Sequence, residues 1–201
     1  MSRETILASV RDALPPKQVL PELANFGLRY DDPIQQFITT AEAVGASLQS
    51  IDTREEIAAA VEAFLPDAKA ILSHVPEVTC KNFTRDADRD PHAYSDLDLV
   101  VVEGLIAVAE NAAIWVPDSQ YDDHAAMVLT QHQVIVVRAS DLVDHMHQAY
   151  AKVAAAAVPR FGFFLSGPTK TADIEQSLVL GAQGTRSLLI ILIRDESPST
   201  I

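Results

Sequence analysis

Short apolar runs and stretches with helical spacing of apolar residues alternate along most of the chain. Apolar residues that recur every three to four positions predict helices. These cover roughly residues 3–14, 33–45, 54–64, 122–131 and 141–157. Continuous apolar runs bounded by turn residues predict buried strands. These are residues 46–51, 69–73, 97–102, 105–109, 113–116, 133–137, 161–165 and 188–193. Strands that alternate with helices predict an α/β fold, with an open, mostly parallel sheet, helices on both faces and one antiparallel hairpin near residues 105–116.

The first 32 residues differ from the rest of the chain. Ser2 is expected to cap a first amphipathic helix, and residues 15–32 are rich in proline, show little periodicity and are typical of a linker. We therefore expect a helical arm and linker over residues 1–32 and one domain over residues 33–201. A lone helix of that length is marginal in water, so the arm is expected to pack on a partner or elsewhere on the domain.

The charge balance restricts the classes of partner. The 201 residues include 15 Lys and Arg against 28 Asp and Glu, a formal net charge of −13. This excess argues against nucleic-acid binding, which needs clustered cations, and against binding to an anionic membrane surface. The N-terminus carries acidic residues, and no apolar run approaches the ~20 residues of a membrane span. The sequence therefore predicts a soluble protein of the cytoplasm.

Cysteine and histidine offer little for a metal or redox site. Cys80 is the single cysteine, which excludes an intramolecular disulfide and a cluster held by several thiolates of this chain, and we expect it to be a structural thiol. His145 and His147 are two positions apart on a predicted helix, so they face different directions. We expect no metal site.

Residues 166–171, SGPTKT, follow a predicted strand and precede a predicted turn of helix. With Thr171 as its N-cap, that helix would leave free amides beside the hydroxyls of Ser166 and Thr169 and the charge of Lys170. Such a group can hold a phosphate or a carboxylate, and the carboxyl end of a strand is where open α/β sheets bind ligands. The alternative is a capped connection without a ligand.

Glu110 and Asn111 lie at the predicted hairpin. A carboxylate between buried strands would be partly desolvated, which raises its pKa and suits it to work as a base or nucleophile. The alternative is that Asn111 only supplies a turn residue and Glu110 points to water.

The stretch 166–184, SGPTKTADIEQSLVLGAQG, closely resembles the signature of the lactate utilisation protein C family, whose domain is called the LUD domain. The matching positions are Ser166, Gly167, Pro168, Thr171, Ala172, Asp173, Ile174, Glu175, Gly181 and Gly184. Thr169 stands where the family has Ser. A second family feature, an Ala-Glu-(Thr or Asn)-Gly hairpin, is matched by Ala109, Glu110 and Asn111, whereas Ala112 replaces the glycine.

The resemblance implies a fold like that of the ribose-5-phosphate isomerase, glucosamine-phosphate deaminase and CoA-transferase group. It also implies a role as an accessory component of L-lactate oxidation to pyruvate, beside separate iron–sulfur and oxidoreductase proteins that would carry the clusters. A small carboxylate or phosphate would then lie at Ser166, Gly167, Thr169, Lys170, Thr171 and Asn111, facing Glu110. Two alternatives stay open: a stand-alone enzyme that uses Glu110 on a sugar phosphate or CoA thioester, and a non-catalytic binding or assembly module. Whether the protein forms a homo-oligomer is also open.

Overall fold

The structure is a computed structural model. It describes residues 2–16, 18–19, 26–83, 90–121, 124–155, 161–174, 177–182 and 184–194, with the backbone alone at 172–174 and 177–178.

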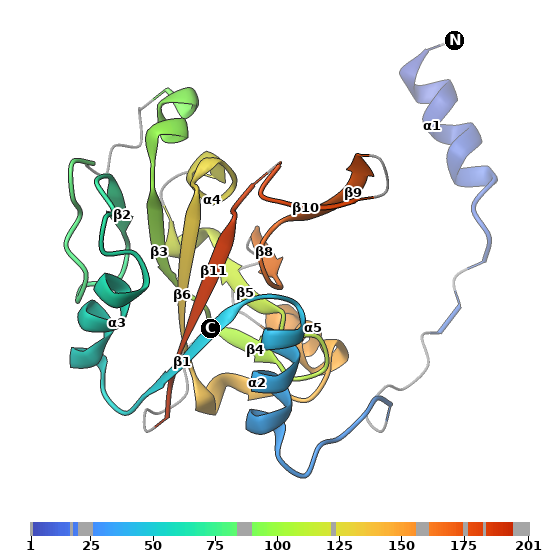
Figure 1. Cartoon of the computed structure of the whole chain (residues 1–201). Coiled ribbons are helices and arrows are strands. Elements are labelled where there is room, and N and C mark those ends of the chain that lie inside the picture. Colours follow the sequence, from blue (N-terminus) through green and yellow to red (C-terminus); the bar gives the residue numbers. More distant parts are fainter. Residues whose placement is uncertain are drawn as a thin grey trace.

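A five-stranded parallel sheet forms the centre of the molecule (Figure 1), in the order β1-β11-β6-β3-β2. The strands are β1 (Ser47–Ile51), β2 (Ile71–Ser73), β3 (Leu99–Glu103), β6 (His132–Arg138) and β11 (Ser187–Ile193). The three middle strands are continuous apolar runs because both faces of the sheet are covered. The predicted α/β fold with a mostly parallel sheet is confirmed.

Different layers cover the two faces. On one face, α3 (Ile57–Phe64) packs on a cluster that includes Val101, Val134 and Ile191. A capping box precedes this helix, across η1 (Arg54–Glu56): the Glu56 carboxylate accepts a hydrogen bond from the amide of Thr53 at 3.1 Å.

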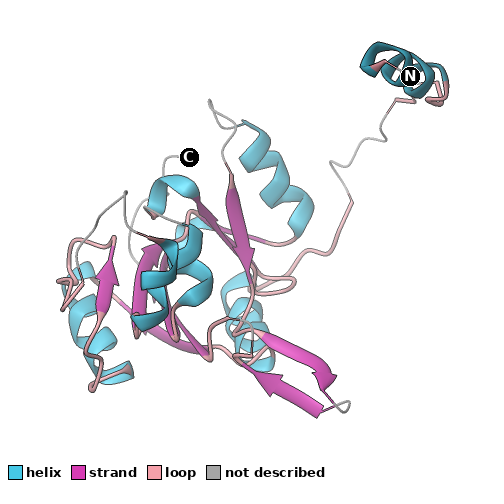
Figure 2. Cartoon of the chain, turned by 90° about the horizontal axis from the view of Figure 1, so that it is seen from above, coloured by secondary structure: helices cyan, strands magenta, loops and turns pink. Residues whose placement is uncertain are grey.

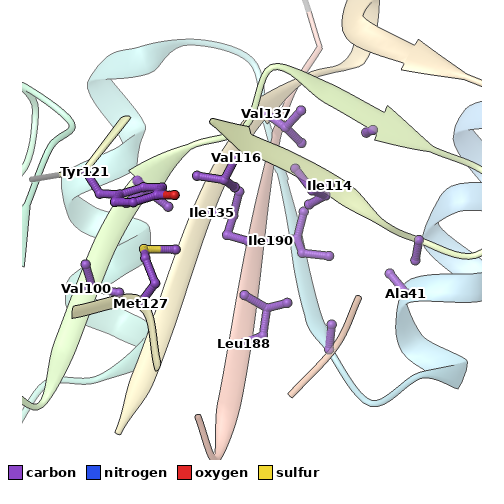
Figure 3. Packing of buried hydrophobic residues seen from close by; sticks show 14 of the residues in the cluster. Ala41, Val100, Ile114, Val116, Tyr121, Met127, Ile135, Val137, Leu188 and Ile190 are labelled. Carbon is purple, nitrogen blue, oxygen red and sulfur yellow. The ribbon is translucent and has the colours of Figure 1, made fainter. Parts of the chain in front are cut away.

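The other face packs against α2 (Pro33–Ala43) and against a second sheet of four strands, in the order β7-β4-β5-β8. Figure 3 shows Ile114 and Val116 of the second sheet against Ile135 and Ile190 of the first. The second-sheet strands are β4 (Ile106–Val108), β5 (Ile114–Pro117), β7 (Leu142–Val143) and β8 (Gly162–Leu165). β4 and β5 form the predicted antiparallel hairpin.

The last long helix begins later than predicted. Ala139–Asp141 form a 3-10 turn (η4), β7 follows, and α5 starts only at Met146 and runs to Ala155. The prediction of a helix from residue 141 is wrong because β7 pairs in parallel with β4, and that pairing takes the backbone that the start of the helix would have used. The outer side of the second sheet then packs on α5 through Val143, Ala149 and Trp115.

The helix predicted after Thr171 is also wrong. The segment forms β9 (Lys170–Ile174) and β10 (Ser177–Leu180), an antiparallel pair that we call the ribbon. Its strands pair chiefly with each other, and Figures 1 and 2 show the ribbon projecting from the body.

Four further helices lie outside these layers or at their edges. They are α1 (Arg3–Asp12), η2 (Pro91–Asp96), η3 (Asp118–Gln120) and α4 (His124–Leu129). Ser2 caps α1 as predicted, since its hydroxyl accepts a hydrogen bond from the amide of Thr5. Among the described residues no helix combines the length and the apolarity needed to cross a membrane.

Candidate functional site

The base of the ribbon lies where β8, α2 and the β4–β5 turn meet. Gly167 has φ +72°, and a Cβ on it would lie 2.6 Å from the carbonyl oxygen of Val44, so only glycine fits there. Beyond it, the amide of Thr169 donates to the carbonyl of Thr185 at 3.0 Å, and the carbonyl of Thr169 accepts from the amide of Gly181 at 2.9 Å. These bonds anchor both ends of the ribbon to each other and to the chain that enters β11.

The structure brings two of the predicted ligand residues into contact. The Ser166 hydroxyl donates a hydrogen bond of 2.6 Å to the carbonyl of Asn111. The Lys170 side chain is exposed and lies over Gly45, at the end of α2. Thr171 pairs with Val179 across the ribbon. Seven functional candidates from the sequence thus fall at the ribbon base or at the adjacent turn, which are Ser166, Gly167, Thr169, Lys170, Thr171, Glu110 and Asn111.

The local structure differs in two respects from the one expected for an anion site. No helix follows Thr171, so no free helix amides point at the loop, and the Thr169 amide is already bonded. β8 also belongs to the second sheet, where it pairs antiparallel with β5, so the ligand rule for parallel sheets does not apply to its end. Ligand binding by these residues stays a prediction, without that support.

Glu110 is exposed, so the expected desolvation of its carboxylate is wrong. Its Oε2 accepts a hydrogen bond of 3.0 Å from the amide of Met146, the first residue of α5. A carboxylate at this position satisfies an unpaired helix amide and interacts favourably with the helix dipole. Asn111 makes an Asx-type turn, with its Oδ1 accepting from the amide of Ala113 at 3.1 Å. Ala112 has φ +55°, the left-handed conformation that glycine favours.

This geometry predicts the behaviour of two Glu110 variants. Glu110→Gln keeps a hydrogen-bond acceptor and should leave function intact, whereas Glu110→Ala should lower the free energy of unfolding by about 1 kcal/mol, as loss of a helix cap does. Urea unfolding measures the stability of the Glu110→Ala protein. Growth on lactate of cells that carry the Glu110→Gln protein measures whether function is intact. A Glu110→Gln protein that folds normally but has lost all function would show that the carboxylate is catalytic.

A second cluster lies at the carboxyl edge of the parallel sheet. β3 ends at Glu103, β6 ends at Arg138, and Arg194 follows β11 directly. Arg54 of η1 donates to Glu77 through Nε (2.5 Å) and Nη2 (2.9 Å), and to Glu103 through Nη2 (2.5 Å). The hydrogen bonds with Glu77 raise the pKa of the Arg54 guanidinium, and the same guanidinium lowers the pKa of the Glu77 carboxyl.

Two further arginines lie at this edge. Nη1 of Arg138 lies 3.9 Å from Oδ2 of the buried Asp141. Nε of Arg194 lies 3.6 Å from Oδ1 of Asp52, and the side chains of Arg194 and Asp52 are both exposed. Arg54 therefore ties the start of α3 to the ends of β2 and β3, and the edge is a network of ion pairs between otherwise distant segments. Within the described ranges no group of three or more His, Cys, Asp or Glu side chains is arranged to hold a metal ion.

Comparison with known proteins places this architecture in a family. The family model of the LUD domain matches residues 81–193, more than half of the chain. The chain belongs to the LUD domain family. Over 116 residues it is 27% identical to "Lactate utilization protein C" of Shouchella clausii (strain KSM-K16), a match that covers 56% of this chain and 51% of that protein. The chain thus aligns with about half the length of this curated relative.

A solved structure shares the fold of this LUD domain. It is the crystal structure of a DUF162 family protein from Deinococcus radiodurans, with a TM-score of 0.64 at 18% sequence identity. The match covers 83% of this chain and 99% of that one. The resemblance to the LUD domain that the sequence indicated is confirmed.

The LUD match includes the ribbon, Glu110 and the strand-end residues Glu103 and Arg138, but not Arg54. The charged edge is not among the features that the sequence predicted. One signal was available: Glu103, Arg138 and Arg194 each end or directly follow an apolar strand run. The carboxyl ends of parallel strands share one edge, so charges in that position come together in space.

Proposed function

We propose that this LUD-domain protein is an accessory component of lactate utilisation in the cytoplasm, and that it acts by contact with separate iron–sulfur and oxidoreductase proteins. The relative named for lactate utilisation supports the pathway. The single cysteine supports a division of labour, because clusters with several thiolate ligands would need the cysteines of other chains.

The projecting ribbon is the observation that carries the proposal. The most distinctive stretch of the family signature forms two strands that stand away from the body and pair chiefly with each other. A two-stranded hairpin is marginally stable in isolation and gains from a partner surface. Leu180 of β10 is an apolar side chain that is 50% exposed on this ribbon. A segment with these properties suits a contact with another protein better than it suits a closed catalytic pocket.

Among the described residues, no specific feature favours the enzyme alternatives. A base or nucleophile of an enzyme acting on a sugar phosphate or CoA thioester would be expected in a partly desolvated site. Glu110 is exposed and its carboxylate bonds the first amide of α5. We therefore keep the non-catalytic role as the proposal.

Deletion of the gene tests the pathway. The deletion strain should fail to grow on lactate as the carbon source, should grow normally on pyruvate, and should recover lactate growth when the full chain is supplied. Normal growth of the deletion strain on lactate would contradict the proposed role, provided that no second copy of the gene exists.

The ribbon's part in that role predicts a sharp difference between two similar variants. Leu180→Asp should leave the melting temperature within about 2 °C of wild type, because Leu180 is half exposed and lies opposite Lys170. It should nevertheless reduce the lactate growth rate several-fold. Val128→Asp on α4, where Val128 is 48% exposed, is the matched control and should grow like wild type. Equal growth of the Leu180→Asp and Val128→Asp strains on lactate would contradict a role for the ribbon in lactate utilisation.

A further inference from the structure

Helix α1 displays an apolar stripe that no described part of its own chain covers. Ile6, Val10 and Leu14 are exposed by 50%, 54% and 64%. Ile6 and Val10 lie one turn apart on one side of α1, and Leu14 follows just beyond the C-cap residue Ala13. Figures 1 and 2 both show α1 apart from the body, and none of its described residues is buried. A helix of 10 residues is marginal in water by itself, so this stripe calls for a partner surface.

The body carries a groove whose chemistry matches the stripe. It has a volume of about 440 Å³ and lies along α5 and β7. Leu142, Val143 and Ala151 give it an apolar lining, while Asp144 and Lys152 supply one charge of each sign. α1 also carries charges of both signs, at Arg3, Glu4, Arg11 and Asp12. An amphipathic helix laid in an apolar groove is a common recognition mode.

The chain that leaves the arm is attached beside this groove. The amide of Tyr30 donates to Oδ1 of Asp144 at 3.3 Å, and Asp144 lines the groove. The ring of Phe26 packs edge-on against the ring of His147, with 5.1 Å between their centroids. The 12 residues from Leu14 to Phe26 can span up to about 40 Å when extended. An arm of this reach can enter the groove of a neighbouring molecule.

Charge distribution favours contact through the arm. Residues 1–19 hold three of the 15 basic residues and two of the 28 acidic ones, which leaves them at +1 and the remainder of the chain at −14. Two such acidic bodies repel each other across an extended interface, whereas a weakly basic arm is attracted to the acidic body.

We propose that two copies of this chain exchange their N-terminal arms, with the Ile6, Val10 and Leu14 stripe of each copy packed into the α5–β7 groove of the other. Reciprocal exchange produces a closed two-fold dimer in which both stripes and both grooves are filled. The second copy is the occupant because α1 makes no packing contact with its own body in the described structure. The dimer is independent of the ribbon and of the role in lactate utilisation.

Sedimentation of the full-length chain tests the exchange. Wild type should have a mass near twice the 21.8 kDa of one chain. Val10→Asp and Ala151→Glu should each shift the protein to monomer and raise the dimer dissociation constant at least ~100-fold, because each brings a carboxylate into the apolar contact. Both positions are exposed in the single chain, so folding is preserved, which a thermal melt checks. Ala8→Asp on the opposite side of α1 and Ala154→Glu outside the groove are matched controls and should stay dimeric.

Mixing the Val10→Asp and Ala151→Glu proteins distinguishes a dimer formed by arm exchange from a dimer formed through any other surface. The Val10→Asp chain keeps an unchanged groove, and the Ala151→Glu chain keeps an unchanged arm. In an equimolar mixture, the arm of the Ala151→Glu chain should bind the groove of the Val10→Asp chain and form a heterodimer. A monomeric wild type, a Val10→Asp protein that remains dimeric, or a mixture that stays monomeric would each overturn the proposal.

Discussion

Replacement of Gly104 by alanine is expected to lower the free energy of unfolding by about 3 kcal/mol, at the upper end of the cost of overpacking a core. Gly104 is buried where the chain passes from β3 of the parallel sheet to β4 of the second sheet. A Cβ at this position would lie 2.2 Å from Cγ2 of Ile114 and 3.2 Å from Cγ2 of Ile135. Both isoleucines are fully buried, so neither methyl group can move away without disturbing the contact between the two sheets.

Urea unfolding of a double variant checks the stated cause. Leucine at position 114 has no Cγ2 methyl group, so Ile114→Leu alone should cost less than about 1.5 kcal/mol and should restore part of the stability of the Gly104→Ala protein. If Gly104→Ala unfolds within about 0.5 kcal/mol of wild type, the two sheets are not packed as closely as described.

Replacement of Arg54 by methionine is expected to lower the free energy of unfolding by about 2 kcal/mol at pH 7. The guanidinium bonds both Glu77 and Glu103, whose side chains are 23% and 19% exposed, so its loss leaves two poorly solvated carboxylates without their cation. Breaking a fully buried pair costs roughly 3–5 kcal/mol, and the partial exposure here reduces that figure.

The loss of unfolding free energy caused by Arg54→Met should become smaller as the pH falls. The pKa of Glu77 is lowered in the folded protein, mainly by its hydrogen bonds from Arg54. The stability that this carboxylate contributes is therefore fully present above its ordinary pKa of 4.5 and is lost as the pH falls through the lowered folded value. Urea unfolding at pH 7 and at pH 3 should show the difference between wild type and variant shrinking in acid. A difference that is the same at both pH values would contradict the ion-pair account.

The parallel sheet could be predicted because its strands carry their own signal. Runs such as residues 188–193 and 133–137 are apolar at every position, which indicates strands covered on both faces. The capping box of Thr53 and Glu56 is equally local, because its two residues lie three positions apart in the sequence.

The ribbon and the start of α5 could not be predicted because contacts between distant residues decide them. Thr171 followed by alanine and acidic residues is compatible with a helix start, but Thr169 pairs with Thr185 and Gly181, which fixes the segment as two strands. Likewise Ser140 is a reasonable helix cap by itself, and only the pairing of β7 with β4 excludes it. Local propensity is a weak guide where tertiary pairing competes with it.

The candidate site shows the same limit. Glu110 could be assigned to a turn from its neighbours, whereas its partner Met146 is 36 positions away. Arg54 and Glu103 are 49 positions apart, so no spacing rule links them. The family could be recognised from residues 166–184, whereas the helix predicted after Thr171 is a pair of antiparallel strands in the structure.

Under the proposed function, the ribbon makes the contact with the iron–sulfur and oxidoreductase proteins of lactate utilisation. The most direct measurement is co-purification with the tagged chain from cells grown on lactate, followed by identification of the bound proteins. Iron–sulfur and oxidoreductase proteins should accompany wild type and Val128→Asp but should be lost from Leu180→Asp. Retention of both proteins by Leu180→Asp, or their absence from wild type, would contradict the claim.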